Sequence, residues 1–283
     1  MTTLRDLLRD ATRYLERHKV EDARTVVELL VARLIKLPRL SLLTVLDHTL
    51  PEPALAALRR GVLRLAQHEP VQYVLGEWDF RNLTLRVDRR ALIPRPETEL
   101  LVDWVLETEP LWQRPAPRVA DIGTGTGCII LSIAAERPNA ECTAVDVSPE
   151  ALALARENAE RHGLAQRVTF LQADACSEFP PASFDALVSN PPYIPAPEIA
   201  GLAPHIRAHE PRLALDGGAE GLTVVRAIVE GASWALRPGG WLFFEVGHDQ
   251  GPATQSLMDS FGFKDTTLRA DHNRHFRFVR GRI

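Results

Sequence analysis

The chain has 283 residues, of which 45% are hydrophobic and 25% charged, and its formal net charge at pH 7 is −4. This composition is typical of a soluble globular protein that can bury a full core in one large domain or two. No run approaches the roughly 18 apolar residues of a membrane span, and the first residues lack the apolar stretch of an export signal. We therefore expect neither a membrane-spanning nor an exported protein.

The three cysteines, Cys128, Cys142 and Cys176, are odd in number and far apart. This spacing supports neither a disulfide framework nor a CxxC zinc site. We expect a reducing, cytoplasmic setting and no bound metal.

Charge is unevenly distributed along the chain. Residues 1–75 carry a net charge of +3, and residues 76–283 carry −7. Proteins that bind the phosphate backbone of nucleic acids usually have a strong excess of basic over acidic residues. We therefore expect no stable nucleic-acid binding.

Residues 1–75 have the apolar spacing of helices. Apolar residues recur three and four positions apart over 4–15, 21–34 and 54–65, and prolines at 51, 53 and 70 mark helix starts and stops. Short helices with one apolar stripe are stable only when packed together, so we expect a helical bundle domain.

Residues 76–93 have the two-residue alternation of strands. Apolar and polar positions alternate on both sides of Arg81–Asn82, which predicts a β-hairpin that connects two domains. A stiff loop with Pro94 and Pro96 follows, and then a helix.

The rest of the chain, 94–283, alternates between strands and helices. Such alternation predicts a mostly parallel sheet covered by helices on both faces. The last two strands are close enough in sequence to pair antiparallel. The predicted strands are 118–122, 141–146, 167–172, 184–189, 240–246, 263–269 and 274–280, and the predicted helices 127–137, 149–163 and 220–237.

A glycine-rich loop joins the first of these strands to its helix. Gly123, Thr124, Gly125, Thr126 and Gly127 place glycines where the chain turns and where a ligand can approach the backbone. The dinucleotide fingerprint needs a third glycine at the next position, where a cysteine stands, and no GKT or GKS follows. These differences argue against NAD, FAD and a P-loop, although glycines alone are also compatible with a simple tight turn.

Two further acids follow the next strands at the same edge of the sheet. Asp146 could accept both hydroxyl groups of a ribose, or it could be only a helix N-terminal acid. Asp174, or the backbone of Ala175, could meet an adenine edge. The combination suits S-adenosylmethionine, a nucleoside with a cationic sulfonium in place of phosphates.

Asn190, Pro191, Pro192 and Tyr193 follow the fourth strand of this domain. The lone pair of a planar nitrogen is delocalised, so such a nitrogen is a poor nucleophile. An asparagine oxygen and a rigid backbone carbonyl can accept hydrogen bonds from its NH₂ group and stabilise the charge it acquires. The tyrosine ring can stack on the planar group. Glu97 and Thr98 could border the amino-acid end of the cofactor, although helix capping explains them equally well. Glu245 could face the crevice, but the favoured interpretation is a carboxylate at a strand end near solvent.

These motifs resemble the release factor glutamine methyltransferases, the PrmC/HemK family, over nearly the whole chain. The matching blocks are IPRPETELLVD (93–103), DIGTGTG (121–127), AVDVS (144–148), SNPPYIP (189–195) and HEPRLALDGGAEGL (209–222).

The resemblance implies a class I, Rossmann-like methyltransferase fold with a seven-stranded α/β sheet, mostly parallel with an antiparallel last strand, and an N-terminal helical bundle for substrate recognition. It implies transfer of a methyl group from S-adenosylmethionine to the Gly-Gly-Gln glutamine of class I peptide chain release factors, yielding S-adenosylhomocysteine. Residues 123–127 and Asp146 would hold the cofactor. Asn190 and the Pro191 carbonyl would hold the amide, and Tyr193 would stack nearby.

Three alternatives remain open on the residues alone. A related enzyme methylates a ribosomal-protein glutamine, and an adenine amino-methyltransferase could use the same Asn190 chemistry on a flipped base. A catalytically silent adaptor is the third.

Overall fold

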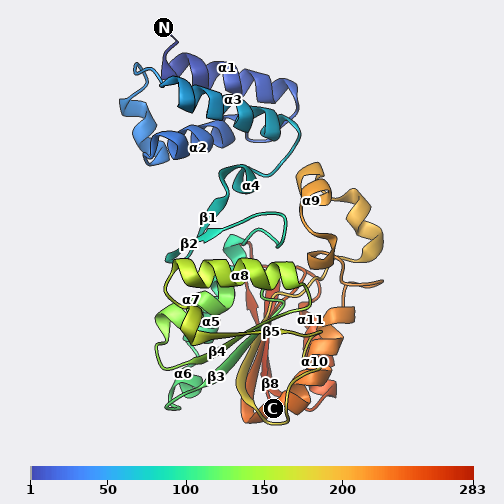
Figure 1. Ribbon diagram of the computed structural model, residues 1–283. Helices are drawn as coiled ribbons and strands as arrows, with labels where there is room; N and C mark the ends of the chain where they lie inside the picture. The colour runs from blue at the N-terminus through green and yellow to red at the C-terminus, as the bar shows by residue number, and fades with distance from the viewer. Residues whose placement is uncertain (1) are drawn as a thin grey trace. The chain divides into compact units, whose positions relative to one another are not determined.

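The computed structural model of the protein describes residues 2–283, and the chain divides into two compact units (Figure 1). The first unit runs to Glu77 and also includes Ala203–His209. The second comprises Trp78–Leu202 and Glu210–Ile283. Within the described residues, no helix is long and apolar enough to cross a membrane.

The first unit is helical, as predicted. A capping box between Thr3 and Asp6 begins the first helix, and its core is formed by residues such as Leu15, Val27 and Leu58. The unit includes a distant helix whose His209 Nε2 lies 3.2 Å from the Gln67 carbonyl oxygen. Its helices are α1 (Leu4–Arg17), α2 (Ala23–Ile35), η1 (Arg39–Thr44), α3 (Glu52–Ala66), α4 (Val71–Leu75) and α9 (Pro204–His209).

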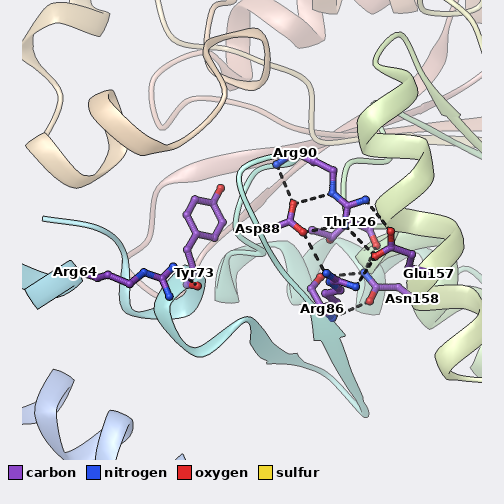
Figure 2. A network of polar contacts seen from close by, with 8 residues as sticks. All are labelled: Arg64, Tyr73, Arg86, Asp88, Arg90, Thr126, Glu157 and Asn158. Carbon is purple, nitrogen blue, oxygen red and sulfur yellow. Dashed lines mark hydrogen bonds and ion pairs between the residues drawn. The ribbon is translucent and has the colours of Figure 1, made fainter. Parts of the chain in front are cut away.

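The predicted hairpin is present, with strands β1 (Glu77–Phe80) and β2 (Leu83–Arg86). Buried Asn158 attaches β2 to the glycine-rich loop, as Figure 2 shows. Its Nδ2 donates to the carbonyl oxygens of Arg86 and Thr126, at 3.1 and 2.9 Å, and its Oδ1 accepts from the Arg86 N–H at 2.7 Å. All the hydrogen-bonding groups of this buried amide are thereby used.

The seven-stranded sheet has the order β5-β4-β3-β6-β7-β9-β8. Its first five strands are parallel, and β9 is antiparallel to both β7 and β8, so the predicted mixed sheet is confirmed. The strands are β3 (Arg118–Ile122), β4 (Glu141–Asp146), β5 (Val168–Gln172), β6 (Phe184–Ser189), β7 (Leu236–Glu245), β8 (Lys264–Ala270) and β9 (Phe276–Arg282).

Both faces of the sheet are buried, because successive residues of one strand belong to different cores. Val119 and Val188 pack in one core, and their neighbours Ala120 and Leu187 pack in the other. This explains the nearly continuous apolar runs of the parallel strands. The helices of the unit are α5 (Pro96–Leu106), α6 (Glu109–Trp112), α7 (Cys128–Glu136), α8 (Pro149–Arg161), α10 (Thr223–Ala235) and α11 (Gly251–Ser260), with short η2 (Ala165–Arg167), η3 (Ala196–Gly201) and η4 (Arg212–Ala214) turns.

Candidate functional site

A cavity of about 220 Å³ lies in the second unit at the carboxyl ends of β3, β4 and β6. The strand order reverses at β3, and such switch points are where ligands bind in open α/β sheets. The structure brings most of the sequence-predicted site residues together here. The predicted residues that line the cavity are Gly123, Thr124, Gly125, Thr126, Asp146, Asp174, Ala175, Asn190, Pro191 and Pro192.

Two predicted residues, Gly127 and Tyr193, are not among those that line the cavity. Gly127 precedes α7 with a φ of +83°, a conformation that favours glycine. A Cβ atom there would lie 3.0 Å from Leu131 Cδ1 and 3.3 Å from Ala155 Cβ. Gly127 therefore allows α7 and α8 to pack closely behind the loop.

The glycine loop is held by the neighbouring strand. The N–H groups of Gly123 and Thr124 both donate to the Val145 carbonyl oxygen, at 2.8 and 2.9 Å. Gly123 and Gly125 have positive φ values of 74° and 55°, and a Cβ at Gly123 would meet nothing within 4 Å. The loop thus presents open backbone to the cavity.

Asp146 accepts hydrogen bonds from the backbone of two loops, the glycine-rich loop after β3 and the loop after β4. Its Oδ2 accepts from the Gly125 N–H and its Oδ1 from the Ser148 N–H, both at 2.9 Å. Burial raises the pKa of this carboxyl group. Each carboxylate oxygen can accept a further hydrogen bond, so Asp146 could fix the loop and still receive hydroxyl donors.

Asp121 is a site residue that the sequence analysis missed. It is fully buried; its Oδ2 accepts from Thr124 Oγ1 at 2.7 Å, and its Oδ1 has no partner among the described residues. Burial and the nearby Asp146 raise the pKa of Asp121 to about 7. The available signal was its place two residues before Gly123.

Asp174 and Ala175 lie on the loop after β5. Asp174 is exposed, and Ala175 has a left-handed φ of +48°. Both line the cavity, so this loop could contact the rim of a bound nucleoside.

Asn190 lies at the other end of the cavity, within a chain of side-chain hydrogen bonds. Its Nδ2 donates to Thr98 Oγ1 at 3.1 Å, and the Thr98 hydroxyl donates to Glu245 Oε2 at 2.7 Å. Thr98 makes no helix-capping bond, and Glu245 is only 1% exposed, so interpreting them as a cap and a solvated strand end is wrong. Burial raises the pKa of Glu245 to about 7.

The Asn190–Tyr193 turn is clamped by a second loop. Gln250 Nε2 donates to the Tyr193 carbonyl oxygen at 2.9 Å, and Gln250 Oε1 accepts from the Gly247 N–H at 2.9 Å. A Cβ at Gly217 would lie 2.8 Å from the Pro192 carbonyl oxygen, so only glycine fits there. Sequence reasoning gave neither Gln250 nor Gly217 a role, although Gly217 lies in a block that it quoted.

The charges around the cavity suit a cation better than a phosphate. The two arginines that line it are already paired, Arg95 with Glu210 at 2.6 Å and Arg90 with Glu157 at 2.8 Å (Figure 2). Asp146 also lines the cavity, and it forms no ion pair among the residues that the structure describes. A sulfonium nucleoside therefore fits this donor set, whereas a pyrophosphate would meet a carboxylate.

Two family descriptions match the chain. Residues 6–76 match the PrmC N-terminal domain, and residues 97–202 match the Methyltransferase small domain.

Curated relatives match over most of their length. The release factor glutamine methyltransferase of Geobacter sulfurreducens is 41% identical over 99% of this chain and 97% of its own. That of Moorella thermoacetica is 43% identical over 92% of this chain and 91% of its own.

A solved methyltransferase from Pyrococcus furiosus shares the fold, with a TM-score of 0.52, 18% identity and coverage of 71% of this chain and 88% of its own.

Proposed function

The chain belongs to the release factor glutamine methyltransferase family, and we propose that it methylates the glutamine side-chain amide of the Gly-Gly-Gln motif in class I peptide chain release factors. The proposed products are N5-methylglutamine and S-adenosylhomocysteine. Identity near 40% over almost the full chain, including the N-terminal unit, supports this substrate. The proposed reaction takes place in the cytoplasm, where release factors act.

The cofactor end of the cavity fits S-adenosylmethionine. In this proposal the open backbone of Gly123–Thr126 lies against the cofactor, Asp146 accepts its ribose hydroxyl groups, and Asp174 and Ala175 border its adenine. The cofactor supplies an electrophilic methyl group on a sulfonium. No metal takes part in the proposed reaction.

The Asn190 end of the cavity fits a primary amide. Asn190 Oδ1 and the Pro191 carbonyl oxygen accept the two N–H groups of the glutamine amide, which holds the nitrogen toward the methyl group. One C–N bond forms as the C–S bond breaks, and the nitrogen then loses one proton to solvent. Tyr193 follows these residues in the same turn, and because burial raises its pKa, its phenol stays neutral.

One observation carries the proposal: Asn190 and the glycine loop line a single cavity. A glutamine of a ribosomal protein would present the same amide. Adenine in nucleic acid is less favoured because residues 76–283, which include the cavity, carry a net charge of −7.

The test is incubation of the purified protein with methyl-labelled S-adenosylmethionine and one of three acceptors: a class I release factor, ribosomal proteins, or an adenine-containing oligonucleotide. We expect label on the Gly-Gly-Gln glutamine alone, located by mass spectrometry, and none on a release factor whose glutamine is replaced. Label only on another acceptor would overturn the proposal.

A further inference from the structure

Three polar side chains from distant parts of the second unit form one hydrogen-bonded line into the cavity. Glu245 ends β7, Thr98 lies in the first turn of α5, and Asn190 follows β6. Glu245 and Thr98 are 1% and 2% exposed, whereas Asn190 and Thr98 both border the cavity.

The line has a direction. Thr98 has a single hydroxyl proton, and an ionised Glu245 can only accept hydrogen bonds. The Thr98 hydroxyl therefore donates its proton to Glu245. Thr98 Oγ1 can then only accept from its other neighbour, which must be the NH₂ group of Asn190. With Nδ2 held in this way, Oδ1 is the atom of the Asn190 amide left for a ligand.

The Glu245 carboxylate is buried with few hydrogen-bond donors around it, which is unfavourable unless the group has a function. Among the described residues, Thr98 is the hydrogen-bond donor to Glu245. Burying a carboxylate with one neutral donor costs free energy of folding. Two arginines, Arg277 and Arg95, act on Glu245 through their positive charge. Each is already paired with another acid, Arg277 with Asp271 at 2.7 Å and Arg95 with Glu210 at 2.6 Å. A role in holding the fold alone would be served as well by an apolar residue.

We propose that Glu245 is a positioning residue that acts through Thr98 to hold the Asn190 amide with Oδ1 toward the substrate NH₂ group. This inference rests on the proposed function, because only an acceptor oxygen at that point can hold an amide or amine nitrogen. If the Asn190 side-chain amide were rotated so that Oδ1 and Nδ2 exchanged places, its NH₂ group would face the NH₂ group of the substrate. The substrate nitrogen would then lose its hydrogen-bond acceptor.

The protonation state of Glu245 determines which groups donate and which accept in the hydrogen bonds between Glu245, Thr98 and Asn190. Burial and the charge of Glu97 of α5 favour its protonated form, while the hydrogen bond from Thr98 and the charges of Arg277 of β9 and Arg95 favour its ionised form. Tyr193 also faces Glu245, but its raised pKa keeps it neutral. When Glu245 is protonated, the Thr98 proton is released and both orientations of Asn190 become compatible with the line.

The first experiment compares Thr98→Val, which keeps the shape and removes the hydroxyl, with Thr98→Ser, which keeps the hydroxyl. We expect Thr98→Val to lower kcat for release factor methylation about tenfold or more, since a misoriented acceptor is lost from the transition state. Thr98→Ser should recover most of that loss. The affinity for S-adenosylmethionine, measured by calorimetry, should change little in both variants and also shows that they fold.

A matched control is Thr254→Val in α11. Thr254 is also fully buried, and its Oγ1 has no hydrogen-bond partner among the described residues. This variant should keep the wild-type kcat. An equal loss in Thr254→Val and Thr98→Val would mean a general effect of removing buried hydroxyls and would overturn the proposal.

The second experiment needs no turnover. In ¹⁵N-labelled protein, the Asn190 side-chain amide signal, identified by its loss in Asn190→Asp, should shift with an apparent pKa near 7. The shift should be absent in Glu245→Gln and Thr98→Val. Asp121 has a similar pKa, and its titration should remain in both variants, which separates the two acids.

The proposed substrate and the proposed positioning role are contradicted by different results. If the wild-type protein labels no release factor but the Asn190 signal follows Glu245, the proposed substrate is wrong and the positioning line stands. If the wild-type protein is active but Thr98→Val has normal kcat, or the Asn190 signal does not follow Glu245, the positioning role is wrong.

Discussion

The two ends of the cavity are built by different means. At the glycine-loop end, a carboxylate binds backbone amides: Asp146 receives the N–H groups of Gly125 and Ser148. At the other end, side chains bind side chains, from Asn190 through Thr98 to Glu245. The difference matters because backbone groups keep their place when a side chain changes, whereas a chain of side chains fails when one member is lost.

This difference predicts that changes at the two ends separate methyl transfer from cofactor binding. The largest effect is expected for Asn190→Ala. Loss of one oriented acceptor should cost about 2–4 kcal/mol in the transfer step, or roughly 30- to 900-fold in kcat. Single-turnover kinetics at saturating S-adenosylmethionine would measure it. The dissociation constant of the cofactor should change little, and near-normal turnover would remove Asn190 from the proposed role.

Asp146→Ala tests the opposite end. We expect the affinity for S-adenosylmethionine to fall by about 1.5–3 kcal/mol, because hydrogen bonds to a charged group are lost. Transfer at saturating cofactor should be largely kept. Calorimetry on Asp146→Ala beside Asp249→Ala, whose side chain is 77% exposed, gives the comparison. An unchanged dissociation constant in Asp146→Ala would refute the ribose contact.

Gly127→Ala tests whether the glycine loop depends on backbone conformation alone. The positive φ should cost about 1 kcal/mol, and crowding against Leu131 should add about another 1 kcal/mol to the loss in free energy of unfolding. Gly163→Ala is the control, because its φ is +68° but a Cβ there would meet nothing within 4 Å. Urea denaturation should show about twice the loss at Gly127, and equal losses would mean that crowding is absent.

Asp121→Asn gives the smallest expected effect and concerns the support behind the loop. Because the pKa of folded Asp121 is about 7 and its ordinary value is 3.8, the folded state holds a proton that the unfolded state has released. The contribution of Asp121 to stability should therefore fall as pH rises between these values, by about 1 kcal/mol from pH 5 to pH 6, beside a similar fall from Glu245, whose pKa is also about 7.

Urea midpoints of the ligand-free protein at these two pH values would measure this fall. Asp121→Asn should remove about that much of the decline, whereas Asp249→Asn should leave it in place. A decline of the same size in Asp121→Asn would assign it to another group, with Glu245 the first candidate.

The glycine-loop end could be predicted from the sequence because its parts are local. The loop follows one strand that periodicity predicts, Asp146 ends the next, and parallel strands bring their carboxyl ends to one edge. The seven strands and the hairpin were predicted for the same reason.

The Asn190 end could be predicted only in part. Asn190 belongs to a recognisable motif, but Thr98 and Glu245 are 147 residues apart, and nothing local shows that Glu245 is buried. The same holds for Asn158, whose amide binds the hairpin 72 residues earlier, and for helix α9, which belongs to the first unit. Such pairings depend on tertiary packing, which local patterns do not encode.

The distances along the chain also bear on the order in which the site forms during folding. The contact between Gly125 and Asp146 closes 21 residues, whereas the contact between Thr98 and Glu245 closes 147. Closing the longer loop costs about 2 kcal/mol more in chain entropy. The contact between Gly125 and Asp146 should therefore form earlier in refolding than the contact between Thr98 and Glu245, so that the nucleoside end of the cavity forms before the amide end.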